Sequence, residues 1–148
     1  MIVIIHMLVG ALIGEKFNSI ALIIILALAT HFILDFIPHW DGKYNKEKFL
    51  KQKKLEIKKK ILVVHMLLFL IGIFVLFEMP KPNGKYHLLL GVFFSLFPDM
   101  LNIFYLKSKN RFVHKCVNFH QRVQRNCGFL LGFSLQLIVF LILIKILF

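Results

Sequence analysis

The sequence predicts an all-α integral membrane protein, a polytopic bundle of about five apolar helices that forms one domain over residues 1–148. Of the 148 residues, 59% are hydrophobic and 17 are phenylalanine. The mean hydropathy of +0.78 is too high for a soluble domain of this size. Several apolar runs also approach or exceed the ~18 residues that mark a membrane-spanning helix.

The first two apolar segments lie at about residues 2–14 and 19–37. The first is short for a span, so we expect it to be tilted, partly inserted or re-entrant. It has no basic flank and contains His6, which argues against a cleaved signal peptide. The second ends before Pro38, which disfavours helix at Ile37 and predicts a turn there.

The other three apolar segments lie at about residues 61–79, 86–106 and 129–148. The first and last of these are predominantly apolar runs of spanning length, so each is expected to form one membrane-crossing helix. The middle one contains Pro98, which lacks the N–H needed for a helical hydrogen bond. We therefore expect the fourth helix to be kinked or broken near Phe97.

The positions of lysine and arginine predict the orientation of these spans. Nine lysines fall between residues 38 and 60, and six lysines or arginines fall between residues 107 and 128. With five spans, both basic segments lie on the same side, and the positive-inside rule assigns that side to the cytoplasm. We expect a multi-pass protein of the inner, or cytoplasmic, cell membrane with a cytoplasmic N-terminus.

The formal net charge of +12 arises mainly from these segments, a cytoplasmic arm at about 41–60 and a cytoplasmic loop at about 107–128. We expect the arm to lie on the inner leaflet and to attract anionic lipid head groups. Nothing in the sequence resembles a nucleic-acid-binding module, so the charge does not predict a nucleic-acid partner.

Ionisable side chains from four spans are predicted to lie at one depth near the cytoplasmic face. At a rise of ~1.5 Å per residue, all of them fall within roughly 10 Å of that interface. They are His6, His31, His65 and Asp99. Burying an ionisable side chain in a membrane costs free energy, so four such side chains at one depth indicate a functional site.

The stretch THFILDFIPHWDG, residues 30–42, carries two histidines and two aspartates. His31 and Asp35 are four residues apart and therefore share one face of a helix. The turn predicted after the span frees His39 and Asp41 to fold back over that face. Imidazole and carboxylate ligands suit Zn²⁺, Mn²⁺ or Fe²⁺, and of these we expect zinc.

These considerations predict a set of site residues. The predicted metal ligands are His6, His31, Asp35, His39, His65 and Asp99. The predicted catalytic groups, one of which would accept the proton of a water molecule, are Asp41 and Asp99. The predicted substrate-binding groups, which can hold an anion near the metal, are Lys43, His120, Arg122 and Arg125. His120 can alternatively fold back as a further ligand.

Each of these side chains also has a structural interpretation. An intramembrane histidine such as His6 or His65 can simply form a hydrogen bond between helices. Asp35 can pair with a lysine of the basic arm, and Asp99 can cap a broken helix. His87 lies at the outer face in this topology and is predicted to be a polar residue of the interface.

Four motifs carry a resemblance to a known family: HMLVG (6–10), HFILDFIPHWD (31–41), HLLLGVFFSLFPD (87–99) and FHQR (119–122). The chain resembles predicted membrane-bound metal-dependent hydrolases, small polytopic bacterial and archaeal proteins with intramembrane histidines and a Pro-Asp motif. The run from His31 to His39 is also similar to the HxxxD…H zinc signature of bacterial phospholipase C, which spaces its last histidine further along. The resemblance implies a metal site. If His87 is a ligand of that site, the fourth span must be deeply re-entrant.

The sequence therefore predicts a membrane-embedded metal-dependent hydrolase that acts on an ester or phosphoester, such as a lipid, at the cytoplasmic leaflet. A metal lowers the pKa of bound water to about 7 and makes hydroxide available. Alternatively, the same residues line a path for metal ions or protons, or hold a structural metal. The outer half offers only His87, Glu15 and Glu78, which disfavours a continuous polar path.

The predicted topology can be tested with single cysteines at positions 51 and 83 in a variant whose native cysteines are replaced by serine. In intact cells, an impermeant maleimide should label Asn83→Cys, and it should label Lys51→Cys only after the membrane is opened. Labelling of both positions from the same side would contradict the topology.

Overall fold

The structure is a computed structural model that describes residues 2–40, 66, 67, 69–74, 84–105, 108, 110–125 and 127–147. Its helices are α1 (Val3–Lys16), α2 (Ile20–Phe36), α4 (Gly84–Tyr105), α5 (Arg111–Val123) and α6 (Phe129–Leu147). Residues 66, 67 and 69–74 are also helical. The predicted all-α fold is confirmed for this part of the chain.

Four of the five predicted apolar segments coincide with α1, α2, α4 and α6, and the helix ends lie within two residues of the predicted ends. α2 ends at Phe36, and the extended backbone of Ile37 (φ −67°, ψ 129°) suits the proline that follows it. The segment predicted at 61–79 is helical where it is described, and its other residues lie outside the described part of the chain.

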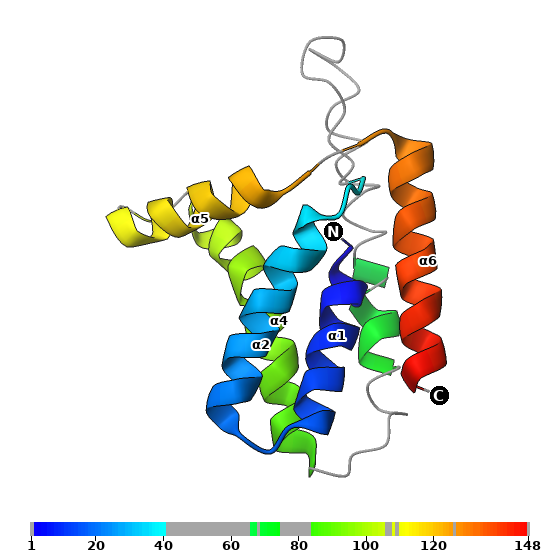
Figure 1. The fold of residues 1–148 in the computed structure, drawn as a ribbon. Helices are drawn as coiled ribbons and strands as arrows, with labels where there is room; N and C mark the ends of the chain where they lie inside the picture. Colours follow the sequence, from blue (N-terminus) through cyan, green and yellow to red (C-terminus); the bar gives the residue numbers. More distant parts are fainter. Residues whose placement is uncertain are drawn as a thin grey trace.

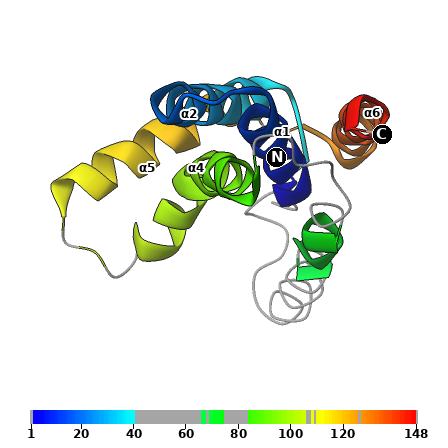
Figure 2. The same cartoon turned by 90° about the horizontal axis from the view of Figure 1, so that it is seen from below.

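Helices α1, α2, α4 and α6 run side by side, and α5 lies across one end of this bundle (Figure 1). Figure 2 shows α1 between α2, α4 and α6. The apolar core surrounds α1 and consists of Ile4, Ile5, Met7, Leu8 and Ala11 with Leu88 and Val92 of α4 and Leu143 and Leu147 of α6. α1 has 14 residues and is about 21 Å long, which is shorter than a membrane is thick.

Facing glycines let α1 and α4 approach closely. Gly10 and Gly14 lie about one turn apart on α1. A Cβ atom at Gly10 would lie 2.5 Å from the carbonyl oxygen of Gly91, and one at Gly14 would overlap the backbone of His87. Small residues at this spacing are typical of helix pairs that meet backbone to backbone in a membrane.

The buried face of α2 is a row of residues spaced four apart: Ile23, Ala27, His31 and Asp35. Residues at this spacing share one face of a helix. The opposite face is apolar but exposed, with Ile25 and Ile33 each 63% accessible. The buried row thus begins with apolar side chains and ends with two ionisable groups, at the end of the bundle that α5 crosses (Figure 1).

Of the two alternatives predicted for the fourth helix, a kink or a break near Phe97, the break is wrong, because α4 continues as one helix through Pro98. Proline removes one helical hydrogen bond, and a helix can absorb that loss by bending. In Figure 2 most of α4 is seen nearly end-on, whereas its last turns run across the view, so the helix is bent.

The structure describes most of one basic segment and none of the other. The arm at about 41–60 lies outside the described residues. The segment at about 107–128, predicted to be a loop, contains the helix α5, which begins where the Asn110 side chain accepts a hydrogen bond from Phe112 N. Its buried residues, Val117 and His120, lie three apart among basic neighbours, so α5 has one face toward the bundle and one exposed face.

Among the described residues, α6 is the one helix that is long and apolar enough to cross a membrane by these two criteria. α2 is similarly apolar but has 17 residues. Most side chains of α6 are exposed, including Leu130 at 80%. The described part of the chain therefore contains one candidate membrane-crossing helix.

Replacement of Gly10 by valine should lower the free energy of unfolding by about 1–3 kcal/mol, because the new side chain would push α4 away from α1. Gly128→Val is the matched control, since a Cβ there meets no atom within 4 Å. Thermal unfolding of both variants in detergent measures the effect. Equal midpoints for the two variants would contradict the close helix contact.

Candidate metal site

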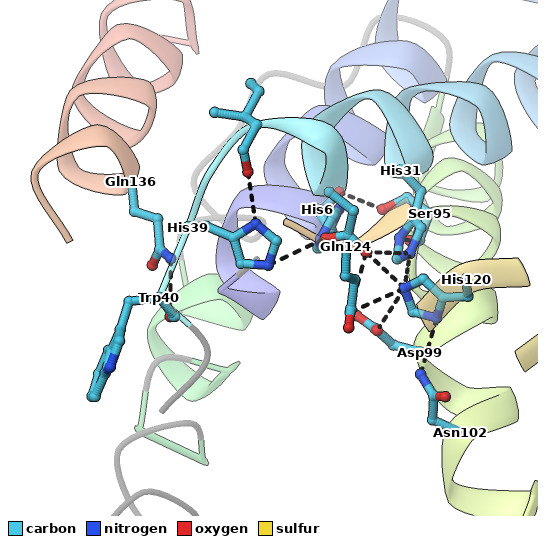
Figure 3. Close-up of polar contacts among 12 residues, drawn as sticks. His6, His31, His39, Trp40, Ser95, Asp99, Asn102, His120, Gln124 and Gln136 are labelled. Carbon is cyan, nitrogen blue, oxygen red and sulfur yellow. Dashed lines mark hydrogen bonds and ion pairs between the residues drawn. The ribbon is translucent and has the colours of Figure 1, made fainter. Parts of the chain in front are cut away.

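Ionisable side chains from four helices meet at the end of the bundle that α5 crosses. They are His6 of α1, His31 and Asp35 of α2, Asp99 of α4 and His120 of α5, together with His39 from the segment after α2. In Figure 3 the rings of His6, His31 and His120 gather at one place, and His39 points toward it from the side of α6. We call these six residues the Asp35 cluster.

One oxygen of Asp35 faces the imidazoles of α2 and α5. Asp35 Oδ2 lies 2.6 Å from His120 Nε2 and 3.4 Å from His31 Nε2. These two nitrogens are 3.2 Å apart. His120 Nε2 is also 3.6 Å from Asp99 Oδ1. Ligand atoms of His31, Asp35, Asp99 and His120 all lie within 4.8 Å of one another.

The other oxygen of Asp35 faces a second pair of imidazoles. Asp35 Oδ1 lies 3.3 Å from His6 Nε2 and 4.0 Å from His39 Nε2. His6 also stacks on His31, with ring centroids 4.2 Å apart. Four imidazoles thus direct an Nε2 atom at one carboxylate.

Backbone carbonyls set the ring orientation of two of these histidines. His31 Nδ1 donates to the carbonyl oxygen of Ser95 at 2.6 Å, and His39 Nδ1 donates to that of Ile37 at 2.7 Å. Because a carbonyl can only accept, each Nδ1 carries the hydrogen and each Nε2 presents a lone pair to the cluster. Metal-ligating histidines are commonly held in this way.

Two amide side chains hold His120. Asn102 Nδ2 lies 3.0 Å from His120 Nδ1, and Gln124 Nε2 lies 3.3 Å from His120 Nε2. Gln124 Nε2 also donates to Asp35 Oδ2 at 3.4 Å. These contacts position the His120 ring against the Asp35 carboxylate.

The backbone segments after α2 and α5 are hydrogen bonded to each other. Arg125 N donates to Asp35 O at 3.2 Å, and His39 N donates to Arg125 O at 3.0 Å. Cys127 N then donates to His39 O at 3.0 Å. These bonds hold His39 beside Asp35, although His39 lies outside any helix.

The donor atoms and several of the distances between them fit a metal ion. Ligand atoms bound at 2.0–2.1 Å around a tetrahedral metal lie about 3.4 Å apart. The separations of 3.2, 3.4 and 3.6 Å among the atoms around His31 and His120 are of this size. The shorter contact between His120 and Asp35 is a charge-assisted hydrogen bond whose proton a cation would displace. The group of His31, Asp35, Asp99 and His120 could therefore hold a metal ion.

Burial distinguishes Asp99 from the other members of the cluster. The side chain of Asp99 is 29% exposed, whereas those of Asp35 and His120 are at most 1% exposed. A fully buried carboxylate needs hydrogen-bond donors or a cation to balance its lost hydration. Asp99 is therefore partly accessible at the surface, whereas Asp35 and His120 are buried.

The structure brings five of the six predicted ligands together. The residues that converge are His6, His31, Asp35, His39 and Asp99, and His120 lies among them in a ligand position. His65, Asp41 and Lys43 lie outside the described residues. His87 lies in the first turn of α4, about 18 Å along the helix from Asp99. It is therefore not part of the cluster.

The two predicted substrate-binding arginines lie at the surface near the cluster. Arg122 is exposed on α5. The guanidinium carbon of Arg125 is 3.9 Å from the centroid of the Phe36 ring, so this cation packs on the end of α2.

Sequence analysis missed three polar residues that support the cluster: Ser95, Asn102 and Gln124. The Ser95 hydroxyl donates to the carbonyl oxygen of His6 and so links α4 to α1. Ser95 and Asn102 lie four residues before and three residues after Asp99, and Gln124 lies four residues after His120. Helical spacing from a ligand was the available signal.

No protein-family model matches this sequence, and neither a curated protein nor a solved structure matches the chain.

Asp35→Ala and His31→Ala should each lower the metal content of detergent-purified protein at least tenfold, because each removes a ligand atom from the centre of the cluster. Elemental analysis of the purified proteins measures the content. His114→Ala is the matched control, since His114 Nε2 bonds to Ser108 O away from the cluster. A metal-free wild type after growth and purification in zinc would contradict the metal site.

Proposed function

We propose that this chain is a membrane-embedded metal-dependent hydrolase whose site opens at the cytoplasmic face. The observation that carries the proposal is the Asp35 cluster, in which imidazoles and carboxylates from four helices meet and only Asp99 is partly exposed. The resemblance of the sequence motifs to predicted membrane-bound metal-dependent hydrolases supports the same function. Zinc is the expected ion, and manganese and iron suit the same ligands.

The outer surface of the bundle supports a polytopic membrane protein. Large apolar side chains are exposed on three helices, with Ile33 at 63%, Phe93 at 47% and Leu130 at 80%. Soluble monomers rarely expose apolar surface on this scale. The 19 residues of α6 extend about 28 Å, close to the ~30 Å of a bilayer's hydrocarbon core.

The exposed cations support a site at the inner leaflet. Arg111, Lys115 and Arg122 are exposed on α5, at the same end of the bundle as the Asp35 cluster. Basic residues accumulate on the cytoplasmic side of membrane proteins. α5 also exposes Phe112 at 70% and Phe119 at 56%, the combination of cations and aromatics found in helices that lie in the head-group region.

The residues of the cluster have separate tasks in this proposal. A bound cation supplies a hydroxide nucleophile near neutral pH. His31, Asp35 and His120 hold the ion, while Asn102 keeps the His120 ring in place. Asp99, the partly exposed carboxylate, accepts a proton from the attacking water.

The surroundings of the site favour an ester or phosphoester substrate of the inner leaflet. The Arg122 guanidinium lies two residues from His120 and is suited to a phosphate or carboxylate group. Exposed Phe119 on the same helix suits acyl chains beside that head group. α5 thus carries a ligand of the site and the groups that would meet a lipid.

A carrier is the rival function, and the core of the bundle weighs against it. Leu8 and Ala11 of α1 and Leu88 of α4 lie between the Asp35 cluster and the far end of α1, and all three are buried and apolar. Ions cross membranes along polar or hydrated paths. The described core is apolar between the Asp35 cluster and the far end of α1, which disfavours a path for ions there.

The hydrolase proposal predicts metal-dependent turnover of phosphoesters or ester lipids by the protein in proteoliposomes. Asp99→Asn should reduce kcat by about 10²–10⁴-fold, because it removes the general base. His114→Ala should retain full activity. Metal uptake without turnover would favour the carrier, and bound metal with neither activity would favour a structural ion.

A further inference from the structure

The carboxylate of Asp35 divides its surroundings into two halves. Oδ2 faces His31 and His120, and Oδ1 faces His6 and His39. The first half belongs to the group of His31, Asp35, Asp99 and His120, whose ligand atoms lie within 4.8 Å of one another. The second half is a further pair of imidazoles beside the same carboxylate.

His6 is the member of the second half whose polar atoms lack hydrogen bonds. It is fully buried, and neither Nδ1 nor Nε2 has a hydrogen-bond partner among the described residues. Its Nε2 nevertheless points at Asp35 Oδ1 from 3.3 Å. A buried imidazole without a hydrogen bond is unfavourable unless something else binds it.

His39 is oriented as a ligand from the opposite side. Its Nδ1 donates to the Ile37 carbonyl oxygen, which leaves the Nε2 lone pair directed at the cluster, 4.0 Å from Asp35 Oδ1. The backbone bonds from His39 to Arg125 and Cys127 hold the residue there. Figure 3 shows His39 and His120 on opposite sides of the cluster, each directed inward.

A single four-coordinate ion would leave two of the imidazoles of the cluster unbound. An ion at Oδ2 would have Asp35, His31 and His120 as protein ligands and a fourth position open beside Asp99, and the two remaining imidazoles lie on the far oxygen of the carboxylate. In two-metal sites the ions are about 3.5–4 Å apart, a separation that one bridging carboxylate spans.

We propose that Asp35 bridges two divalent cations, one held by His31 and His120 at Oδ2, beside Asp99, and a second held by His6 and His39 at Oδ1. The first position belongs to the proposed metal site, and the inference rests on that site. The second position is additional, and it draws on α1 and the segment after α2.

Two adjacent cations narrow the substrate class. A pair of ions binds two oxygens of one group, and it stabilises both the attacking and the leaving oxygen of a displacement at phosphorus. A phosphoester offers such oxygens, whereas a carboxylic ester offers one carbonyl oxygen to a metal. The second position therefore favours a phosphoester over a carboxylic ester.

The test uses Mn²⁺ as the probe, bound to the full chain in detergent after chelation and dialysis. Wild type should bind two Mn²⁺ per chain and show the electron paramagnetic resonance spectrum of a spin-coupled Mn²⁺ pair. His6→Ala and His39→Ala should each bind one ion and show an uncoupled spectrum. His114→Ala should match the wild type.

The outcomes separate this inference from the proposed function. A wild type that binds one uncoupled ion overturns the bridged pair, while turnover of phosphoesters by the same preparation would leave the hydrolase intact. Two ions with an uncoupled spectrum, or two ions retained in both His6→Ala and His39→Ala, also overturn it. Because the wild-type spectrum needs no substitution, the test stands even if a variant fails to fold.

Discussion

The buried carboxylate of Asp35 is the constraint on which the arrangement of this protein depends. An ionised carboxylate without partners at such depth costs several kcal/mol, so the groups around it must stay in place. Here the partners are imidazoles that arrive from α1, α2 and α5, and His6 and His120 are 114 positions apart in the chain. The same carboxylate that links these helices is the ligand that a cation would share.

Close helix packing makes this convergence possible. The glycine contact between α1 and α4 allows Ser95 to bond to both neighbouring helices: its hydroxyl donates to the His6 carbonyl oxygen, and its own carbonyl oxygen accepts from His31 Nδ1. A side chain that separated α1 from α4 would disturb both histidines at once. The packing of the bundle and the geometry of the cluster therefore depend on each other. A cation that binds the folded form would stabilise the bundle.

α6 contributes to the site as well as to the apolar surface. Gln136, buried in this otherwise apolar helix, donates to the carbonyl oxygen of Trp40 at 3.1 Å. Gly132 provides the space, because a Cβ there would lie 2.5 Å from Trp40 N. The segment that carries His39 is thus held by α6 on one side and by the backbone after α5 on the other. A helix predicted only as a membrane span supports the second imidazole pair.

The sequence by itself determined the helical segments and the pairing of His31 with Asp35, because hydrophobic runs and helical spacing are local properties. The depth argument also predicted that His6 and Asp99 would lie near that pair. Only the tertiary structure decided that α5 is a helix, that α4 continues through Pro98, and that His120 contacts Asp35. Those outcomes depend on how helices that are far apart in the chain pack together, and on which oxygen of Asp35 each histidine ring faces. No local sequence pattern encodes either of these.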